Sequence, residues 1–278
     1  MKVPYILFVG ALVGIALFGS ILLWRATPNG LGLVNDSAAY VGGADNLLAG
    51  NGYTRTSGGG ELKPITHFPP LFSLMLASFN FTGLELVEIG HALILIFFGL
   101  STILTGWIVF RITESKGLGL FSAFLLACSD TALGVFASLM SEPLFIVLML
   151  SALLSFGMYY EQRRKRWLLI TGMILGFAYL TRFAALSLIA AFLIAVMVLD
   201  QPRAFRITSF WKPTATLLLG MLPFLLSWSI YNWWITGEVG NRTLILHLIP
   251  NETLFSGLKN LLTWLAPQEL LAIHPIFG

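Results

Sequence analysis

Long apolar runs constrain this chain more than any other feature of its sequence. The first, Tyr5 to Trp24, contains no charged residue, and as a helix it would be about 30 Å long, enough to cross a bilayer. Its length and the lack of a small-x-small site before Arg25 favour an uncleaved span over a signal peptide. Charged residues make up only 10% of the chain, against about 25% in soluble domains. We therefore expect an all-α, polytopic membrane helix bundle.

The apolar runs and the turns between them predict seven transmembrane helices. We expect them at Tyr5 to Trp24, at Glu88 to Phe110, twice within Gly117 to Tyr160, as two short helices turning at Arg182 within Trp167 to Leu199, and at Pro213 to Ile235. The apolar segment from Pro69 to Leu84 is short and interrupted by polar residues. It is expected to lie along the interface or to re-enter the membrane.

Basic residues in the short turns set the expected orientation. The turn at Glu161 to Trp167 contains the run Arg-Arg-Lys-Arg, and the turns at 111–116 and 200–212 are also basic. Because basic loops remain on the cytoplasmic side, we expect a multi-pass protein of the plasma (inner) membrane with its N-terminus inside. The first outer loop (25–87) and residues 236–278, with an amphipathic stretch from Leu254 to Leu271, then face outward. The whole chain, 1–278, is expected to form a single membrane domain.

The first outer loop contains the longest polar passage, Asn35 to Pro70. Its first half predicts a short helix over Ala38 to Ala49, with polar residues 35–37 able to cap its start and Gly50-Asn51-Gly52 to end it. Asp36 would face the positive end of the helix dipole, with Tyr40 one turn further on the same side and Asp45 on the opposite side. Asp36 is therefore either a helix cap or a functional carboxylate.

Four charged or polar residues within or beside the spans fall toward the outer face: Asp130, Glu142, Arg182 and Asn232. Ionisable groups at membrane depth are costly, so they mark a functional site by default. Their convergence on the face that holds the polar loop predicts an outward-facing active site. Structural roles stay open, since Glu142 can serve as a helix-dipole partner and Arg182 can snorkel or pair with a carboxylate.

Composition excludes several other classes of protein. A single cysteine, Cys128, rules out a disulfide framework and a thiolate metal cluster. The net charge of +3 arises from short loops, so no nucleic-acid partner is implied. No histidine pair or carboxylate cluster has metal-ligand spacing. A divalent metal ion is therefore possible only by tertiary assembly, with Asp36 as a possible ligand.

Five segments resemble, in order, the signatures of the GT-C membrane glycosyltransferases. They read NDSAAYVGGADNLLAGNGY, HFPPLFSLMLA, SLMSEPLFIVLML, YLTRFAAL and LPFLLSWSIYNWWITGEVGNR. The most similar branch is the protein O-mannosyltransferase and aminoarabinose-transferase-like group, and the resemblance covers nearly the whole chain. Two positions depart from it. Tyr231-Asn232 stands where the family often has Arg-Asn, and His91 stands where it often has Arg.

The resemblance implies a glycosyltransferase that moves a sugar from a polyprenyl-phosphate-linked donor to an extracytoplasmic lipid, glycan or protein acceptor. It implies Asp36 as the catalytic acidic residue. Such transfer needs a base for the acceptor hydroxyl and positive charge for the departing phosphate. Glu142 and Asp130 are the further catalytic candidates, and the predicted substrate-binding residues are Arg182, Tyr40, Lys63, His67 and Asn232. Because the family usually has more spans, we expect a truncated member that lacks acceptor-binding parts.

Two other classes of function compete with this hypothesis. A transporter or flippase of a lipid-linked substrate would predict inverted repeats and broken helices with polar residues at the midplane, and the sequence shows neither. A non-catalytic membrane scaffold would tolerate the replacement of Asp36 by asparagine.

Overall fold

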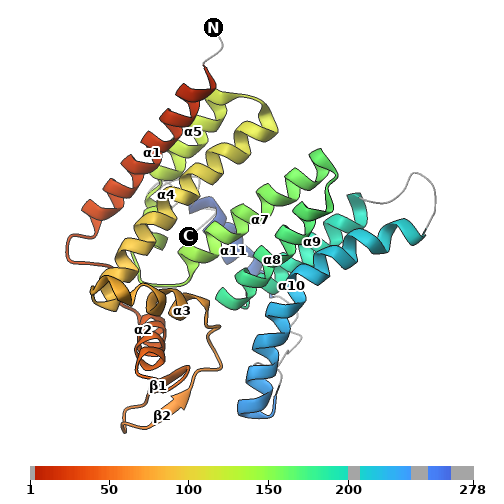
Figure 1. Cartoon of the computed structure of the whole chain (residues 1–278). Coiled ribbons are helices and arrows are strands. Elements are labelled where there is room, and N and C mark those ends of the chain that lie inside the picture. Colours follow the sequence, from red (N-terminus) through yellow and green to blue (C-terminus); the bar gives the residue numbers. More distant parts are fainter. Residues whose placement is uncertain (1–3, 200–206, 239–249, 264–278) are drawn as a thin grey trace. The chain divides into compact units, whose positions relative to one another are not determined.

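The computed structural model describes residues 4–199, 207–238 and 250–263 (Figure 1). The chain falls into two compact units, Met1–Asn241 and Arg242–Gly278. Helices dominate the described residues, which confirms the all-α fold class. The expectation of one membrane domain over the whole chain stays a prediction.

The first unit contains seven longer helices: α1 (Tyr5–Ala26), α4 (Leu86–Thr113), α5 (Lys116–Ala127), α7 (Glu142–Gln162), α8 (Lys165–Thr181), α9 (Ala185–Leu199) and α10 (Ile207–Thr236). Its shorter elements are α2 (Asn35–Leu48), the hairpin of β1 (Thr54–Thr56) and β2 (Leu62–Pro64), α3 (Leu71–Ser78), the 3-10 turn Asn80–Thr82, and α6 (Asp130–Phe136). In the second unit, the described helix is α11 (Asn251–Thr263).

Helices lie at all the positions predicted to span the membrane, but the number of seven crossings is not confirmed. Among the described residues, four helices are long and apolar enough to cross a bilayer: α1, α4, α7 and residues 211–236 of α10. The pair α5 and α6 would make a fifth, although it is bent by 59°. Helices α8 and α9 are each shorter than one crossing, and α8 ends directly before Arg182, as the predicted turn required.

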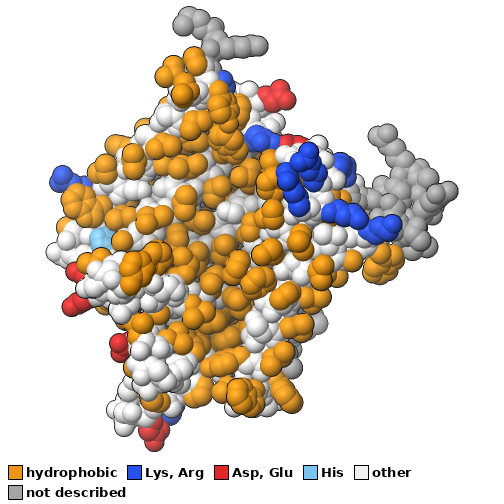
Figure 2. Space-filling view, in the orientation of Figure 1, with side chains coloured by type: hydrophobic (Ala, Val, Ile, Leu, Met, Phe, Trp, Pro, Cys, Tyr) orange, Lys and Arg blue, Asp and Glu red, His pale blue; other side chains and the backbone are white. Residues whose placement is uncertain are grey.

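The helices of the first unit form two groups joined through α4 and α7. Helices α1, α4 and α5 pack together, and α8 packs between α7 and α10 with α9 beside it (Figure 1). Figure 2 shows apolar side chains over most of the visible surface, with a cluster of Lys and Arg at the end where α7 turns into α8. This cluster is the exposed Arg-Arg-Lys-Arg run at 163–166. The ionised groups of the bundle are thus confined mainly to its ends.

Small residues let α8 and α10 approach closely. A Cβ atom added at Gly172 would overlap the carbonyl oxygen of Leu217 and lie 3.0 Å from the Cα of Gly220. A Cβ added at Gly220 would lie 2.5 Å from the carbonyl oxygen of Leu169. Backbone therefore packs on backbone, which is typical of helix pairs in membranes.

Replacing Gly172 with alanine is expected to destabilise the bundle by about 1–3 kcal/mol, because the backbone of α10 has to move away. The thermal unfolding of the protein in detergent measures this loss. The matched control is Gly157→Ala on α7, where nothing lies within 4 Å of an added Cβ. That substitution should be neutral or stabilising, since alanine favours the helix. Equal unfolding temperatures for the two variants would refute the close packing of α8 on α10.

Helix α2, in the first outer loop, begins three residues earlier than the predicted helix over Ala38 to Ala49. The helix begins at Asn35, so its N-cap is Val34, in an extended conformation, and none of residues 35–37 is the N-cap residue. Ser37 takes part in capping from the third helical position, where its hydroxyl accepts a hydrogen bond of 3.0 Å from the backbone N–H of Val34. The expected glycine stop is confirmed, because α2 ends at Leu48 and Gly50 has a φ of 79°. The hairpin that follows was not predicted.

Candidate functional site

Helix α2 is fixed against the segment that leads into α7. The Ser37 hydroxyl donates to the carbonyl oxygen of Leu139 at 2.8 Å. The backbone of Gly32 donates to Ala137 at 2.8 Å and accepts from Leu139 at 3.0 Å. These bonds join residues about a hundred positions apart, and they bring the first turn of α2 beside the start of α7.

A hydrogen-bond network then connects three helices. The Tyr40 hydroxyl on α2 lies 2.8 Å from the Ser141 Oγ, which precedes α7. The same oxygen accepts a hydrogen bond of 3.2 Å from the guanidinium of Arg182, directly after α8. Arg182 also forms an ion pair of 2.6 Å with the Glu142 Oε1, in the first turn of α7. The structure therefore brings together three of the predicted site residues, Tyr40, Glu142 and Arg182.

The ion pair between Arg182 and Glu142 is partly exposed to solvent, and one of the two Glu142 carboxylate oxygens has no hydrogen-bond partner among the described residues. The side chains of Arg182 and Glu142 are 29% and 28% exposed. The second carboxylate oxygen of Glu142 is buried and has no hydrogen-bond partner among the described residues. A buried carboxylate oxygen without a donor is costly, so it is an acceptor to which a bound ligand could donate.

Asp36 lies one helical turn before Tyr40, at the start of α2. Its side chain is half-buried, and no hydrogen bond or ion pair to it occurs within the described ranges. Burial raises the pKa of Tyr40, the Ser141 hydrogen bond and the charge of Arg182 lower it, and the carboxylates of Glu142 and Asp36 raise it again. All three charges therefore act on one buried phenol, which stays protonated near neutral pH because its pKa is above the usual value of 10.0.

The other predicted site residues lie outside this network. Asp130 is exposed in the first turn of α6, and Lys63 on β2 is exposed and 3.9 Å from Glu61. His67 is exposed and packs edge-on against Phe68. Asn232 on α10 is fully buried, and neither of its amide atoms has a hydrogen-bond partner in the part of the chain that the structure describes. Their functional roles stay predictions.

Ser141 is the residue of the network that sequence reasoning missed. Its side chain is completely buried, and its single hydroxyl serves both Tyr40 and Arg182. A serine directly before a helix normally indicates a cap, so its spacing gave no signal of a bridge between α2 and α8.

Under the predicted substrate-binding role of Arg182, replacing Ser141 with alanine is expected to raise about tenfold the KM for the sugar donor that the sequence resemblance implies, because Arg182 loses an acceptor that orients it. Tyr40→Phe is the matched variant. It removes the other partner of Ser141 but leaves the bond to Arg182, so its KM should change less. Separate kcat and KM values from initial rates distinguish the two. A larger KM increase in Tyr40→Phe than in Ser141→Ala would contradict the bridging role.

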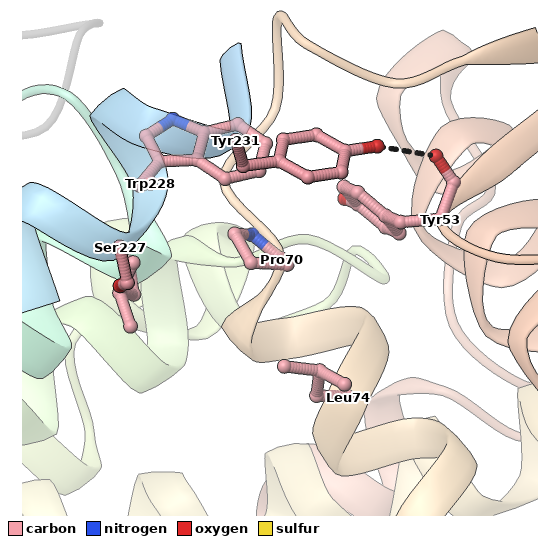
Figure 3. A pocket seen from close by; sticks show the side chains of 7 residues that line it. Tyr53, Pro70, Leu74, Ser227, Trp228 and Tyr231 are labelled. Atoms are coloured by element: carbon pink, nitrogen blue, oxygen red, sulfur yellow. Dashed lines mark hydrogen bonds between the residues drawn. The ribbon is translucent and has the colours of Figure 1, made fainter. Parts of the chain in front are cut away.

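An apolar cavity of about 300 Å³ lies between the outer loop and α10 (Figure 3). The residues that line it are Tyr53, Pro70, Leu74, Leu180, Ser227, Trp228 and Tyr231. The Tyr231 hydroxyl donates to the backbone carbonyl of Tyr53 at 3.2 Å, and its ring stacks on Trp228 with centroids 5.1 Å apart. Leu180 precedes Arg182 by two residues, so this cavity and the ion pair share the end of α8.

No group of three or more potential metal ligands occurs among the residues with described positions. The suggestion that Asp36 binds a divalent ion therefore stays a prediction. The site contains the Asp36 carboxylate, which is unpaired among the described residues, the Glu142 carboxylate in its ion pair with Arg182, and the protonated phenol of Tyr40. These groups can accept a proton and attract an anion.

Fold and site together define a multi-pass membrane protein with a small ionised cluster at one end of its helix bundle. Residues 68–228 match the model of the dolichyl-phosphate-mannose-protein mannosyltransferase family, and the chain belongs to this family. No curated protein and no solved structure matches the chain. Membership confirms the resemblance to GT-C enzymes and makes the chain a glycosyltransferase of mannosyltransferase type. The matched residues include Glu142 and Arg182, whereas Asp36 and Tyr40 precede them.

Proposed function

We propose that this chain transfers a glycosyl group from a polyprenyl-phosphate-linked donor to a hydroxyl acceptor on the extracytoplasmic side of the membrane. The observation that carries the proposal is the network that ties Arg182 and Glu142 to Tyr40 on the helix of Asp36. One cation and two carboxylates then act at one end of a lipid-embedded bundle. This arrangement suits a substrate with an anionic head and an apolar tail.

In the proposed reaction, the acceptor oxygen attacks the anomeric carbon of the donor sugar. Asp36 takes the proton of the attacking hydroxyl, since its carboxylate is half-buried and unpaired within the described residues. The bond between the anomeric carbon and the phosphate oxygen breaks, and the phosphate leaves with the electron pair. Arg182 stabilises the negative charge that develops on this phosphate.

Glu142 and the apolar cavity complete the proposed site. Glu142 holds Arg182 through one carboxylate oxygen, and its second oxygen is available to accept a hydrogen bond from a hydroxyl of the donor or acceptor. The cavity beside Leu180 and Trp228 provides an apolar surface near Arg182 for the first part of the carrier chain. Burial of apolar surface there would contribute about 25 cal/mol per Å² to donor binding.

A donor-discrimination assay tests this proposal. The purified protein in liposomes is supplied with labelled polyprenyl-phosphate-mannose or, separately, with labelled GDP-mannose, together with mixed lipid, glycan and peptide acceptors. We expect release of polyprenyl phosphate from the first donor and no turnover of the second. Use of the nucleotide sugar, or equal release by wild type and Asp36→Asn, would overturn the proposal. The same acceptor mixture shows which acceptor class receives the label.

A further inference from the structure

The turn between α7 and α8 is a cluster of four exposed cations: Arg163, Arg164, Lys165 and Arg166 (Figure 2). The acidic residue closest before it is already paired, because Glu161 forms an ion pair with Arg111 on α4. Within the described ranges, no carboxylate pairs with the last three of the four cations. Neighbouring cations repel one another, so the turn attracts anions.

Aromatic rings hold two of these guanidinium groups in place. The guanidinium carbon of Arg163 lies 4.9 Å from the ring centroid of Tyr160, and that of Arg166 lies 5.3 Å from the ring centroid of Trp167. Trp167 is itself fixed, since its indole N–H donates to the Gln162 Oε1 at 2.9 Å. A guanidinium that stacks on a ring still has N–H groups along its edge, and these suit a phosphate.

An exposed apolar strip follows Arg166 along α8. Ile170 and Met173 are 36% and 41% exposed, and they stand four and seven positions after Arg166, on the same face of the helix. This face therefore presents a cation first and then, within about 10 Å, an apolar surface. An anionic phospholipid has the same order, with a phosphate followed by acyl chains.

We propose that the turn at 163–166 and this strip bind an anionic phospholipid. Its phosphate lies at the guanidinium groups, and one acyl chain lies along Ile170 and Met173. Basic sites at the ends of membrane helices bind anionic head groups in this way. The apolar strip favours lipid over a soluble anion, because a soluble anion has no acyl chain to cover it. Tyr160 and Trp167 also suit the membrane interface, where such rings are enriched.

The proposed site is built from α7 and α8 alone, within the first unit. Helices α8 and α10 run in the same direction, since an added Cβ at Gly172 would meet Gly220 and one at Gly176 would meet Phe224. The start of α10 is thus at the end of the bundle that holds the basic turn. The chain leaves α10 at Thr236, at the opposite end.

Native mass spectrometry of the full chain tests the proposal. Protein in detergent is mixed with equal amounts of phosphatidylglycerol and phosphatidylcholine that have identical acyl chains. We expect the wild type to retain several-fold more phosphatidylglycerol. Arg164→Gln combined with Arg166→Gln should abolish this preference.

Arg25→Gln combined with Arg55→Gln is the matched control. It removes the same charge from exposed arginines outside the turn, and Arg25 also lies over a ring, 5.4 Å from the centroid of Trp24. The control should keep the wild-type preference. Arg164→Lys combined with Arg166→Lys keeps the charge that directs insertion, so it serves if the glutamine variant does not fold. Its preference should be intermediate, because lysine lacks the planar fork of donors.

Four outcomes would overturn the proposal. Equal retention of both lipids by the wild type would mean that the head group is not recognised. An equal loss of preference in the control would mean that net charge alone decides retention. A lysine variant with the full wild-type preference would remove the role of the guanidinium groups. Displacement of the lipid by an equal concentration of glycerophosphoglycerol, the head group without acyl chains, would mean that the ligand is a soluble anion. No outcome depends on glycosyl transfer, so the test is independent of the proposed activity.

Discussion

Replacing Asp36 with asparagine is expected to lower the turnover of a polyprenyl-phosphate-linked donor by about 10²- to 10⁴-fold. The amide has nearly the shape of the carboxylate but cannot take the proton of an attacking hydroxyl. The substitution removes no hydrogen bond or ion pair found within the described residues, so α2 should keep its fold. Initial rates at saturating donor, measured beside the thermal unfolding temperature, separate loss of chemistry from loss of structure.

Asp45→Asn is the matched control for this prediction. Asp45 lies on the same helix but is exposed and away from the network, so its replacement should leave the rate unchanged. If Asp36→Asn kept the wild-type rate, or if both variants lost activity equally, Asp36 would be no more than a residue of the first helical turn.

Replacing Arg182 with glutamine is expected to have the second large effect, a loss of about 10²- to 10³-fold in kcat/KM. The charge that we propose to stabilise the departing phosphate is then missing. The variant also leaves the Glu142 carboxylate without its cation in a partly buried position, which costs up to about 3 kcal/mol of stability after allowance for solvent. Arg182→Lys should be intermediate, because lysine keeps the charge but not the planar fork of donors.

A double variant separates these two roles of Arg182. Arg182→Gln combined with Glu142→Gln replaces the ion pair with two neutral amides, so the thermal stability should return toward that of the wild type. Activity should not return, because the phosphate still lacks its positive charge. Recovery of both stability and activity in the double variant would show that the ion pair is purely structural.

Apolar runs and basic turns predicted the helices well because membrane insertion is governed by local hydropathy. The turn at Arg182 was predicted from the length of the apolar run from Trp167 to Leu199, which is too long for one crossing. Helix α8 does end directly before Arg182. The predicted start of α2 was three residues too late, because Ser37 lies within the first helical turn, where it accepts from the backbone N–H of Val34 and donates to the carbonyl of Leu139. A contact between residues a hundred positions apart leaves no local signal.

The candidate site was predictable only in part for the same reason. Pairing with a carboxylate was one of the structural roles left open for Arg182, and in the structure its partner is Glu142. Asp130 is exposed in the first turn of α6, beyond a bend of 59° from α5, and the sequence does not predict that bend. The role of Ser141 depends on which helices meet around it. Residue type therefore identified the charged groups, while tertiary packing decided which of them meet.

The account depends on a site that opens to the extracytoplasmic side, and cysteine accessibility in intact cells tests this most directly. In the Cys128→Ser background, Gly59→Cys places a thiol in the exposed turn of the outer-loop hairpin, and Arg164→Cys places one in the exposed basic turn after α7. A membrane-impermeant maleimide should label position 59 in intact cells and position 164 only after permeabilisation. Labelling of position 164 but not of position 59 from outside would contradict the account.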